Sequence, residues 1–174
     1  MRNSEKVVYR CPKFIVAEKD FKLPHGRIVR GYPFIRRGPS ALILAFKEDR
    51  LLLLKEYRPV LGCWMYQLPG GKIEKGEVPL AGAKREVEEE TGYRVKSIKP
   101  LFSAWLSPSF IKQLNHFFIA QLAGNGEQEL DFDETIKVEF VKLDKVLRMI
   151  KDGKITSMPS IAGILYYVIS TGKE

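Results

Sequence analysis

Hydrophobic and polar residues alternate over short stretches in the first third of the chain, which predicts β-strands there. The pattern is broken by Pro24, Gly26 and Gly31, residue types that favour turns. Two more continuous apolar runs follow on either side of the turn at 47–50 and predict a buried hairpin. The expected strands are residues 7–10, 14–23 and 26–35 in an N-terminal antiparallel arm, and residues 40–46 and 51–57 in the hairpin.

Beyond residue 93 the pattern predicts a mixture of strands and helices. Gly153 would end the first of these helices, and Ser157 or Ser160 would begin the second. A sheet whose faces are covered by a few helices defines an α/β or α+β fold. The expected elements are strands at 94–105, 112–123 and 135–143, and helices at 143–153 and 157–171.

Between these two groups, the segment from Pro79 to Gly92 predicts a helix with two different faces. Proline suits the first turn of a helix, and glycine suits the left-handed residue that ends one. At 3.6 residues per turn, three glutamates fall within an arc of about 100 degrees, and a separate stripe is apolar. We expect a wet acidic face and a buried apolar one. The acidic face comprises Glu86, Glu89 and Glu90, and the apolar stripe comprises Leu80, Ala83 and Val87.

The acidic face suits a divalent cation. Glu86 and Glu90 lie four residues apart, where like charges on a helix repel by about 0.2–0.5 kcal/mol. Mg²⁺ would offset that cost, because it takes oxygen ligands and bridges carboxylates to substrate phosphates. Arg85, four residues before Glu89, would hold that side chain in place. The alternative is an ordinary solvated acidic helix face, which the glutamate run alone favours.

The full spacing over residues 71–93 resembles the Nudix box. The last position holds Tyr93, where an aliphatic side chain is more usual. The resemblance implies an α/β/α sandwich with a mixed sheet, in which the box forms a loop, a helix and a loop. The matching pattern is Gly71, five residues, Glu77, seven residues, Arg85 and Glu86, two residues, Glu89 and Glu90, one residue, Gly92 and an apolar residue.

The resemblance also implies a role for each of these side chains. The carboxylates would bind Mg²⁺, with Mn²⁺ as an alternative, and activate water for attack on a phosphoanhydride. Glu89 or Glu134 would accept the proton from that water, and Glu77 and Arg85 would brace the loop and the helix. The metal ligands implied are Glu86, Glu89, Glu90 and the backbone carbonyl of Gly70.

Several segments outside the box are similar to the ADP-ribose pyrophosphatase branch of that family. KEYRP resembles the glutamine-tyrosine-arginine strand of that branch and implies that Arg58 contacts substrate, and IRRGPSAL implies the same for Arg37. Gln67 replaces a usual glutamate, and Gln113 stands where an acid is usual, which leaves the exact substrate open. The activity implied is hydrolysis of ADP-ribose to AMP and ribose 5-phosphate. Further matches are Pro108, 16 residues after Gly92, and Glu134 in LDFDETIKVEFV.

Composition narrows the class of protein. A chain of 174 residues with 45% hydrophobic content can form a packed core, and we expect an arm at 1–40 and a hydrolase domain at 41–174. Two cysteines are too few for a disulfide framework, and no secretory or membrane-spanning segment is evident, so we expect a cytoplasmic protein without a membrane partner. The net charge of +8 suits an anionic nucleotide as well as nucleic acid, but no nucleic-acid-binding motif accompanies it.

Alternatives to ADP-ribose hydrolysis stay open at this stage. One is a Nudix hydrolase of a nucleotide sugar or an oxidised nucleotide, and another is a non-catalytic Nudix-type protein that binds RNA or a ligand. The complete set of glutamates argues against the second alternative. The N-terminal arm cannot close a core alone and predicts a homodimer. We assign His25, His116 and Cys63 to structural positions.

Overall fold

The computed structural model describes residues 5–124 and 126–172, and these form two compact units. One unit comprises the chain up to Pro39 together with Ala104–Asn115. The other comprises Ser40–Ser103 and the chain from His116 onward. The division after residue 39 lies beside the expected boundary at 40, but the first unit also includes 104–115, which the sequence placed with the hydrolase domain.

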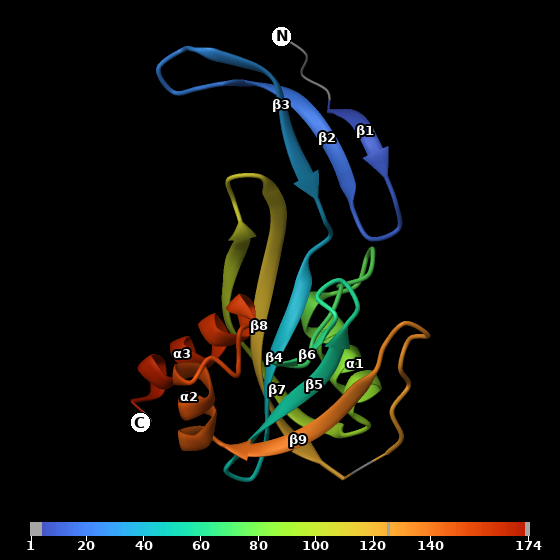
Figure 1. Ribbon diagram of the computed structural model, residues 1–174, viewed down its shortest axis with the longest axis vertical. Helices are drawn as coiled ribbons and strands as arrows, with labels where there is room; N and C mark the ends of the chain where they lie inside the picture. Colours follow the sequence, from blue (N-terminus) through green and yellow to red (C-terminus); the bar gives the residue numbers. More distant parts are fainter. Residues whose placement is uncertain (1–4, 125, 173–174) are drawn as a thin grey trace. The chain divides into compact units, whose positions relative to one another are not determined.

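The first unit is built on three antiparallel strands, as the alternation predicted. Strand β2 pairs with both of its neighbours, for example at Val7↔Ala17 and Ala17↔Phe34. The last of the three also pairs in parallel with β8 at Ile35↔Ile111, so the sheet is mixed. The strands are β1 (Lys6–Arg10), β2 (Ile15–Lys22) and β3 (Ile28–Arg36), drawn in blue in Figure 1.

The second unit is organised around β5, which pairs antiparallel with β4, β6 and β9. The predicted hairpin between β4 and β5 forms at Phe46↔Leu51. Strand β5 also pairs with β9 from Arg50 to Glu56, and it pairs with β6 from Leu54 to Arg58. Strand β8 lies next to β4 and also pairs with β7. The remaining strands are β4 (Ser40–Lys47), β5 (Arg50–Arg58), β6 (Cys63–Gln67), β7 (Arg94–Ser107), β8 (Ile111–Ala123) and β9 (Ile136–Lys142). The end of β7 from residue 104 and the start of β8 up to residue 115 belong to the first unit.

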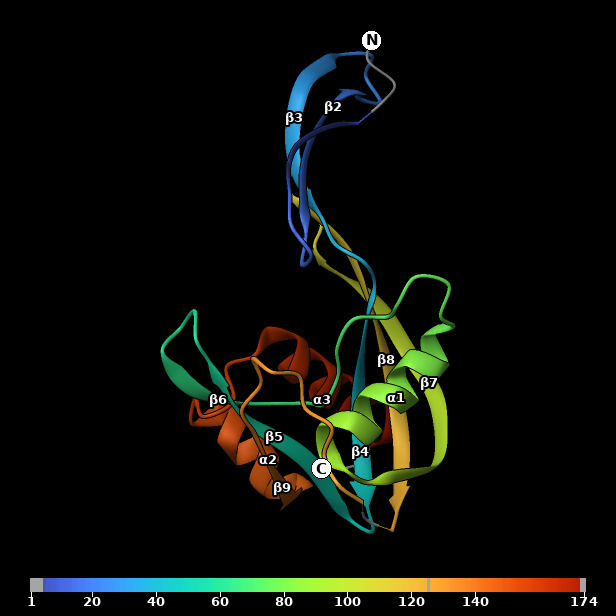
Figure 2. The same ribbon diagram turned by 90° about the vertical axis from the view of Figure 1, so that its right-hand side faces the viewer.

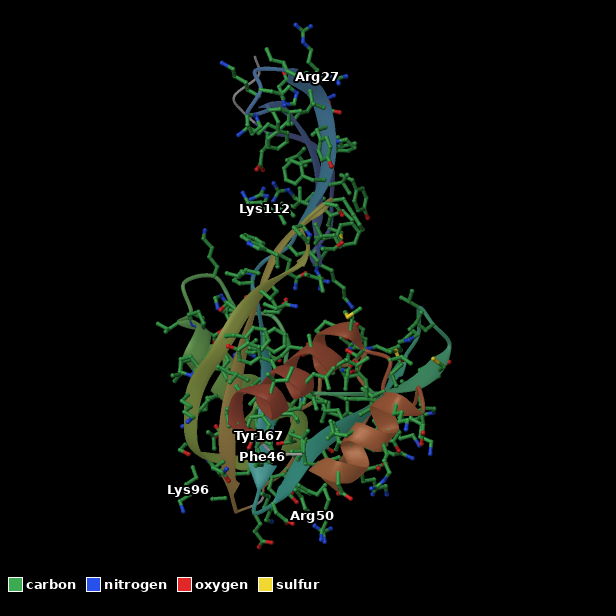
Figure 3. All side chains as sticks on the ribbon, turned by 90° about the vertical axis from the view of Figure 1, so that its left-hand side faces the viewer. Arg27, Phe46, Arg50, Lys96, Lys112 and Tyr167 are labelled. Carbon is green, nitrogen blue, oxygen red and sulfur yellow. The ribbon has the colours of Figure 1, made fainter. Side chains whose placement is uncertain are left out.

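Three helices cover the two faces of this sheet: α1 (Pro79–Thr91), α2 (Leu143–Lys151) and α3 (Met158–Thr171). Alternate residues of β4 and β5 divide between two cores, because successive strand side chains point to opposite faces. Ile43 and Leu52 pack with α1, whereas Leu44 and Leu51 pack with α2 and α3. Figure 2 shows α1 beside β4, and Figure 3 shows Phe46 against Tyr167 of α3. The predicted α/β/α sandwich is confirmed.

Most predicted elements are confirmed within one to three residues, and one strand was missed. Residues 63–67 form β6, where the sequence analysis expected no strand. The last helix begins at Met158 after Ser157, while Ser160 lies inside it and its hydroxyl accepts the Leu68 amide at 2.9 Å. Across residues 5–124 and 126–172, none of the helices has the length and apolar character needed to cross a membrane.

Candidate active site

Helix α1 begins and ends where the sequence predicted. Pro79 occupies the first turn, and Gly92 adopts a left-handed conformation with φ 71°, its amide donating to the Glu88 carbonyl at 2.9 Å. Gly82, which costs about 1 kcal/mol relative to alanine in a helix interior, has a packing reason. A Cβ at this position would lie 2.8 Å from Oε2 of Glu77. The glycine therefore lets the glutamate approach the helix.

Two expectations about the faces of α1 are wrong. The acidic face is only partly wet, because Glu89 is 39% exposed whereas Glu90 is 5% exposed beneath the loop that precedes the helix. Leu80 is 39% exposed and does not belong to the buried stripe, which is formed by Ala83 and Val87. The stripe was drawn from helical angle alone, and Leu80 lies in the first turn, outside the buried core cluster that contains Ala83 and Val87.

The loop before α1 is fixed on strand β4 by backbone hydrogen bonds. The Ile43 amide donates to the Pro69 carbonyl and the Ala41 amide to the Gly71 carbonyl, both at 2.9 Å. Gly70 has φ 147°, and a Cβ there would overlap the Ala41 carbonyl oxygen. The Gly70 amide then donates to Oε2 of Glu90 at 2.7 Å. The two glycines thus bring the loop backbone into contact with the carboxylates of the helix.

Arg85 joins the loop to the helix, as the resemblance implied. Its guanidinium pairs with the carboxylates of Glu77 at 3.0 Å, Glu86 at 2.9 Å and Glu89 at 2.8 Å. It also donates to the Lys72 carbonyl at 3.1 Å. The hydrogen bond from Arg85 lowers the pKa of Glu77, whose carboxylate also accepts the Glu74 amide. One arginine therefore holds three acids in a fixed arrangement.

Burial gives the two innermost acids unusual proton affinities. Burial raises the pKa of Glu86 to about 7, although the charge of Arg85 opposes the change. Burial also raises the pKa of Glu90, against the hydrogen bond from Gly70, and the nearby charges of Glu86, Glu134 and Glu56 raise it further. Carboxylates that raise one another's pKa in a buried site are typical of functional sites.

These carboxylates do not form a preassembled metal cage. Among residues 5–124 and 126–172, no three acidic, histidine or cysteine side chains are close enough to hold an ion as they stand. Arg85 binds Glu86 and Glu89, and the Gly70 amide binds Glu90. The residues nevertheless fit a hard divalent cation, because the donors of Glu86 and Glu90 are all carboxylate oxygens and the charge of Glu86 raises the pKa of Glu90.

A loop following β8 is attached to the carboxyl end of α1 and carries Glu134. The Gln128 side chain donates to the Glu90 carbonyl at 2.6 Å, and the Glu129 amide donates to the Glu89 carbonyl at 2.8 Å. These bonds satisfy helix carbonyls that have no partner within the helix. Burial raises the pKa of Glu134, and its charge is felt by Glu86 and Glu90. The predicted acid is therefore near the other carboxylates.

A surface cleft of about 450 Å³ runs along the outer side of α1 within the second unit. Its walls include Arg85 and Glu89 from the helix and Glu127 and Glu129 from the attached loop. The cleft gives solvent access to the exposed side of the Arg85 cluster. It does not include Glu90, which is buried beneath the loop that precedes the helix.

Arg58 ends strand β5 next to two buried polar side chains. It pairs with Glu56 at 2.7 Å and donates to Oε1 of Gln67 at 2.9 Å. Sequence reasoning noted Gln67 but missed Glu56. Its signal was available, since strand alternation places Glu56 on the same face as the core residue Leu54.

The other implied substrate residues belong to the first unit. Arg37 is exposed, and its backbone amide donates to the backbone carbonyl of Lys112. The adjacent Arg36 forms an ion pair with Glu5 at 3.3 Å. Pro108 lines a cavity of about 340 Å³ within that unit. Gln113 is buried there on β8.

The side chains assigned to structural positions carry ordinary contacts. His116 on β8 shares a hydrogen bond of 2.9 Å with Ser103 of the neighbouring strand. Cys63 is an exposed free thiol at the start of β6, and Cys11 is also unpaired. His25 lies in the exposed turn between β2 and β3.

Comparison with known proteins places this site in a family. A model of the NUDIX domain matches residues 36–161. An ADP-ribose pyrophosphatase of Bacillus subtilis (strain 168) is 31% identical over 150 residues, covering 85% of this chain and 81% of the relative. A GDP-mannose pyrophosphatase of Enterobacter sp. (strain 638) is 29% identical, covering 77% and 75%. A methanol dehydrogenase activator of Bacillus methanolicus is 32% identical, covering 84% and 80%.

A solved structure described as an ADP compounds hydrolase has the same fold, with a TM-score of 0.82 and 20% identity over 99% of this chain and 95% of that one. The chain belongs to the Nudix family, has its fold, and is a Nudix pyrophosphatase. Members of this family generally use divalent metal ions.

Replacing Gly70 by alanine should destabilise the protein far more than the same change at Gly76. Both glycines have positive φ, which costs an alanine about 1–3 kcal/mol. At Gly76 nothing lies within 4 Å of the added Cβ, whereas at Gly70 it would overlap the backbone of Ala41. Urea unfolding should show a loss for Gly70→Ala that exceeds the Gly76→Ala loss by at least about 2 kcal/mol. Equal losses would contradict the close packing of this loop.

Glu86 should make the metal-free protein less stable as pH rises. Folding raises its pKa from 4.5 to about 7, so the folded state binds more protons than the unfolded state in that window. This contribution is complete below pH 4.5 and lost as pH rises through 7, a change on the order of 3 kcal/mol because each pKa unit corresponds to about 1.4 kcal/mol.

Urea unfolding between pH 4 and 8, in the presence of a chelator, measures this change in the free energy of unfolding. Glu86→Gln cannot titrate and should show a flatter profile than the natural chain. The slope that remains in the variant includes the contribution of Glu90, whose pKa is raised in the same direction. Parallel profiles for the two proteins would rule out the assignment to Glu86.

Proposed function

We propose that this enzyme hydrolyses the diphosphate bond of a nucleoside diphosphate linked to another moiety, with Mg²⁺ as its metal and ADP-ribose as its preferred substrate. The observation that carries the proposal is the buried carboxylate pair Glu86 and Glu90, held between the loop of Gly70 and the guanidinium of Arg85. The relative named ADP-ribose pyrophosphatase supports the substrate. The expected products are AMP and ribose 5-phosphate.

The metal would be held by Glu86 and Glu90, assisted by Glu89 and the carbonyl of Gly70. When bound, Mg²⁺ supplies neutralisation of phosphate charge and a more acidic water molecule. The protein keeps these acids on one rigid element, since α1 is fixed to β4 through the loop and through the packing of Ala83 and Val87. Rigid placement of the acids lowers the cost of assembling the site.

Between the two candidates for the general base, we favour Glu134. Glu89 is paired with Arg85 at 2.8 Å, so one of its carboxylate oxygens is already engaged by the guanidinium. Burial instead raises the pKa of Glu134, which brings it closer to that of a useful proton acceptor near neutral pH. A positioned base of this kind commonly contributes about 100- to 10,000-fold to the rate.

The second candidate substrate is a nucleotide sugar. The relative named GDP-mannose pyrophosphatase covers a similar share of this chain. In both substrates a nucleoside diphosphate is joined to a sugar, so the same carboxylates and Arg58 serve either one. A cytoplasmic location is part of the proposal, because the thiols of Cys11 and Cys63 are unpaired and suit a reducing compartment.

A substrate panel with product identification tests the proposal. Purified protein with Mg²⁺ should cleave ADP-ribose with a higher kcat/KM than GDP-mannose, NADH, diadenosine polyphosphates or 8-oxo-dGTP. Glu90→Gln should retain the fold and lose at least about 100-fold in kcat, because it removes a charged ligand while keeping the side-chain volume. Lys154→Gln is the control, because Lys154 lies in the turn after α2, and this variant should retain full activity.

A turnover number for Glu90→Gln equal to that of the natural chain would exclude the proposed metal ligands. Preference for GDP-mannose would instead select the second candidate substrate. Activity that persists after exhaustive chelation would remove the metal from the proposal.

We also propose that the enzyme is a homodimer formed through the first unit. Four aromatic side chains of this unit are exposed around its cavity, an unusual concentration of apolar surface for a monomer. Aromatic residues are also the ones enriched at protein interfaces. The residues concerned are Phe21, Tyr32, Trp105 and Phe110.

Sedimentation at micromolar concentration should therefore give twice the mass of one chain. Trp105→Arg should shift the protein towards the monomer, because it places a charge within the aromatic surface. Val60→Arg is the matched control, since Val60 is fully exposed at the turn between β5 and β6 in the other unit. A monomer in the natural chain at that concentration would refute the dimer.

A further inference from the structure

One face of the sheet changes from apolar to polar as it approaches the end of β5. Every second residue of β5, at positions 52, 54, 56 and 58, lies on the same face of the sheet, which is the face that packs against α1. Gln67 of β6 is the register partner of Leu54 and so lies on this face too. Glu56 and Gln67 are only 4% and 7% exposed. Two polar side chains are thus buried at the edge of a hydrophobic core, where an unpaired polar group would be costly.

Glu56, Gln67 and Arg58 satisfy one another in a closed ring of contacts. Arg58 uses Nη1 to pair with Oε1 of Glu56 at 2.7 Å, and it donates from Nη2 to Oε1 of Gln67 at 2.9 Å. Gln67 closes the ring by donating from Nε2 to Oε2 of Glu56. An amide can accept from the arginine and donate to the carboxylate at once, whereas an ionised carboxylate can only accept. The ring therefore joins one carboxylate and one amide to the arginine.

This ring fixes the guanidinium while leaving part of it accessible. Two planar groups hold Arg58 from the buried side, yet 44% of its side chain remains exposed. An arginine held in this way loses less conformational freedom when it binds a ligand, and its flat guanidinium suits phosphate oxygens. Arg58 also interacts with Glu134, since each charge lies in the other's field. The fixed cation is therefore in the same polar region as the proposed base.

The charge of the ring depends on both buried members together. Glu56→Gln alone would leave two amides beside Arg58, and Gln67→Glu alone would leave two carboxylates. The two changes made together would restore one carboxylate and one amide.

We propose that Glu56 and Gln67 act as a pair of positioning residues that hold Arg58 ready to bind a phosphate of the substrate. The identity of that phosphate rests on the proposed function, whereas the coupling between the two side chains does not. The inference predicts that either residue can carry the carboxylate, provided that the other carries the amide.

A double-mutant cycle tests this coupling. Glu56→Gln and Gln67→Glu should each lower kcat/KM by about 10- to 100-fold, mainly through a higher KM, because binding by Arg58 is lost in the ground state and the transition state alike. The double variant E56Q/Q67E should recover to within about threefold of the natural chain. Recovery requires the two sites to be coupled, which purely structural damage at each site does not produce.

Two further variants exclude a general effect on the sheet. Glu139→Gln makes the same chemical change on the adjacent strand β9, where Glu139 accepts a hydrogen bond from Tyr66, and it should leave KM unchanged. In a background of Arg58→Ala, Glu56→Gln should have no additional effect on KM, because its action passes through the arginine. If Glu56→Gln raises KM in the Arg58→Ala background as much as it does in the natural chain, the positioning role is wrong. A kcat/KM of the double variant no higher than that of either single variant would also overturn it.

Failure of the proposed function can be told apart from failure of this inference. If the natural chain hydrolyses nothing in the panel, the proposed function is wrong, and the four proteins of the cycle are compared by calorimetric binding of inorganic pyrophosphate with Mg²⁺. About tenfold weaker binding in each single variant and recovery in the double variant would still support the ring. Identical affinities in all four proteins would overturn it.

Discussion

The site depends on the burial of negative charge at the junction between a loop and a helix. The carboxylate of Glu90 accepts a hydrogen bond from the amide of Gly70. The carboxylate of Glu86 lies under the same loop and forms an ion pair with Arg85. The approach is possible because neither Gly70 nor Gly71 carries a side chain. A buried carboxylate pair is unfavourable for folding alone. The structure therefore keeps two carboxylates close together in a buried site, where a divalent cation would offset the repulsion that Arg85 leaves.

The fold holds this junction rigid by embedding both partners in one core. Strand β4 receives the loop through hydrogen bonds from Ala41 and Ile43, and the same two residues pack beside Val87 of the helix. The carboxyl end of α1 is held separately by the loop that contains Gln128. The acids vary little in position, because backbone contacts rather than flexible side chains set the distance between the loop and the helix.

The sequence predicted features set by local chemistry better than those set by packing. Proline and glycine at the ends of α1, and the pairing of Arg85 with Glu89, follow from helix geometry and are confirmed. The exposure of Leu80 and the burial of Glu90 depend on which element covers each face, which periodicity does not specify. Strand β6 and the role of Glu56 were missed for a related reason, since a short strand and a buried acid become evident only beside their partners.

The ring of Glu56, Gln67 and Arg58 restricts how this part of the chain can change over time. A lineage that exchanges the carboxylate and the amide must pass through an ancestor with two of the same kind. Two adjacent buried carboxylates repel each other, whereas two amides remain neutral and can still accept from the arginine. The route through paired glutamines avoids that repulsion but gives up the carboxylate that holds Arg58, so a change at one of these positions favours a compensating change at the other.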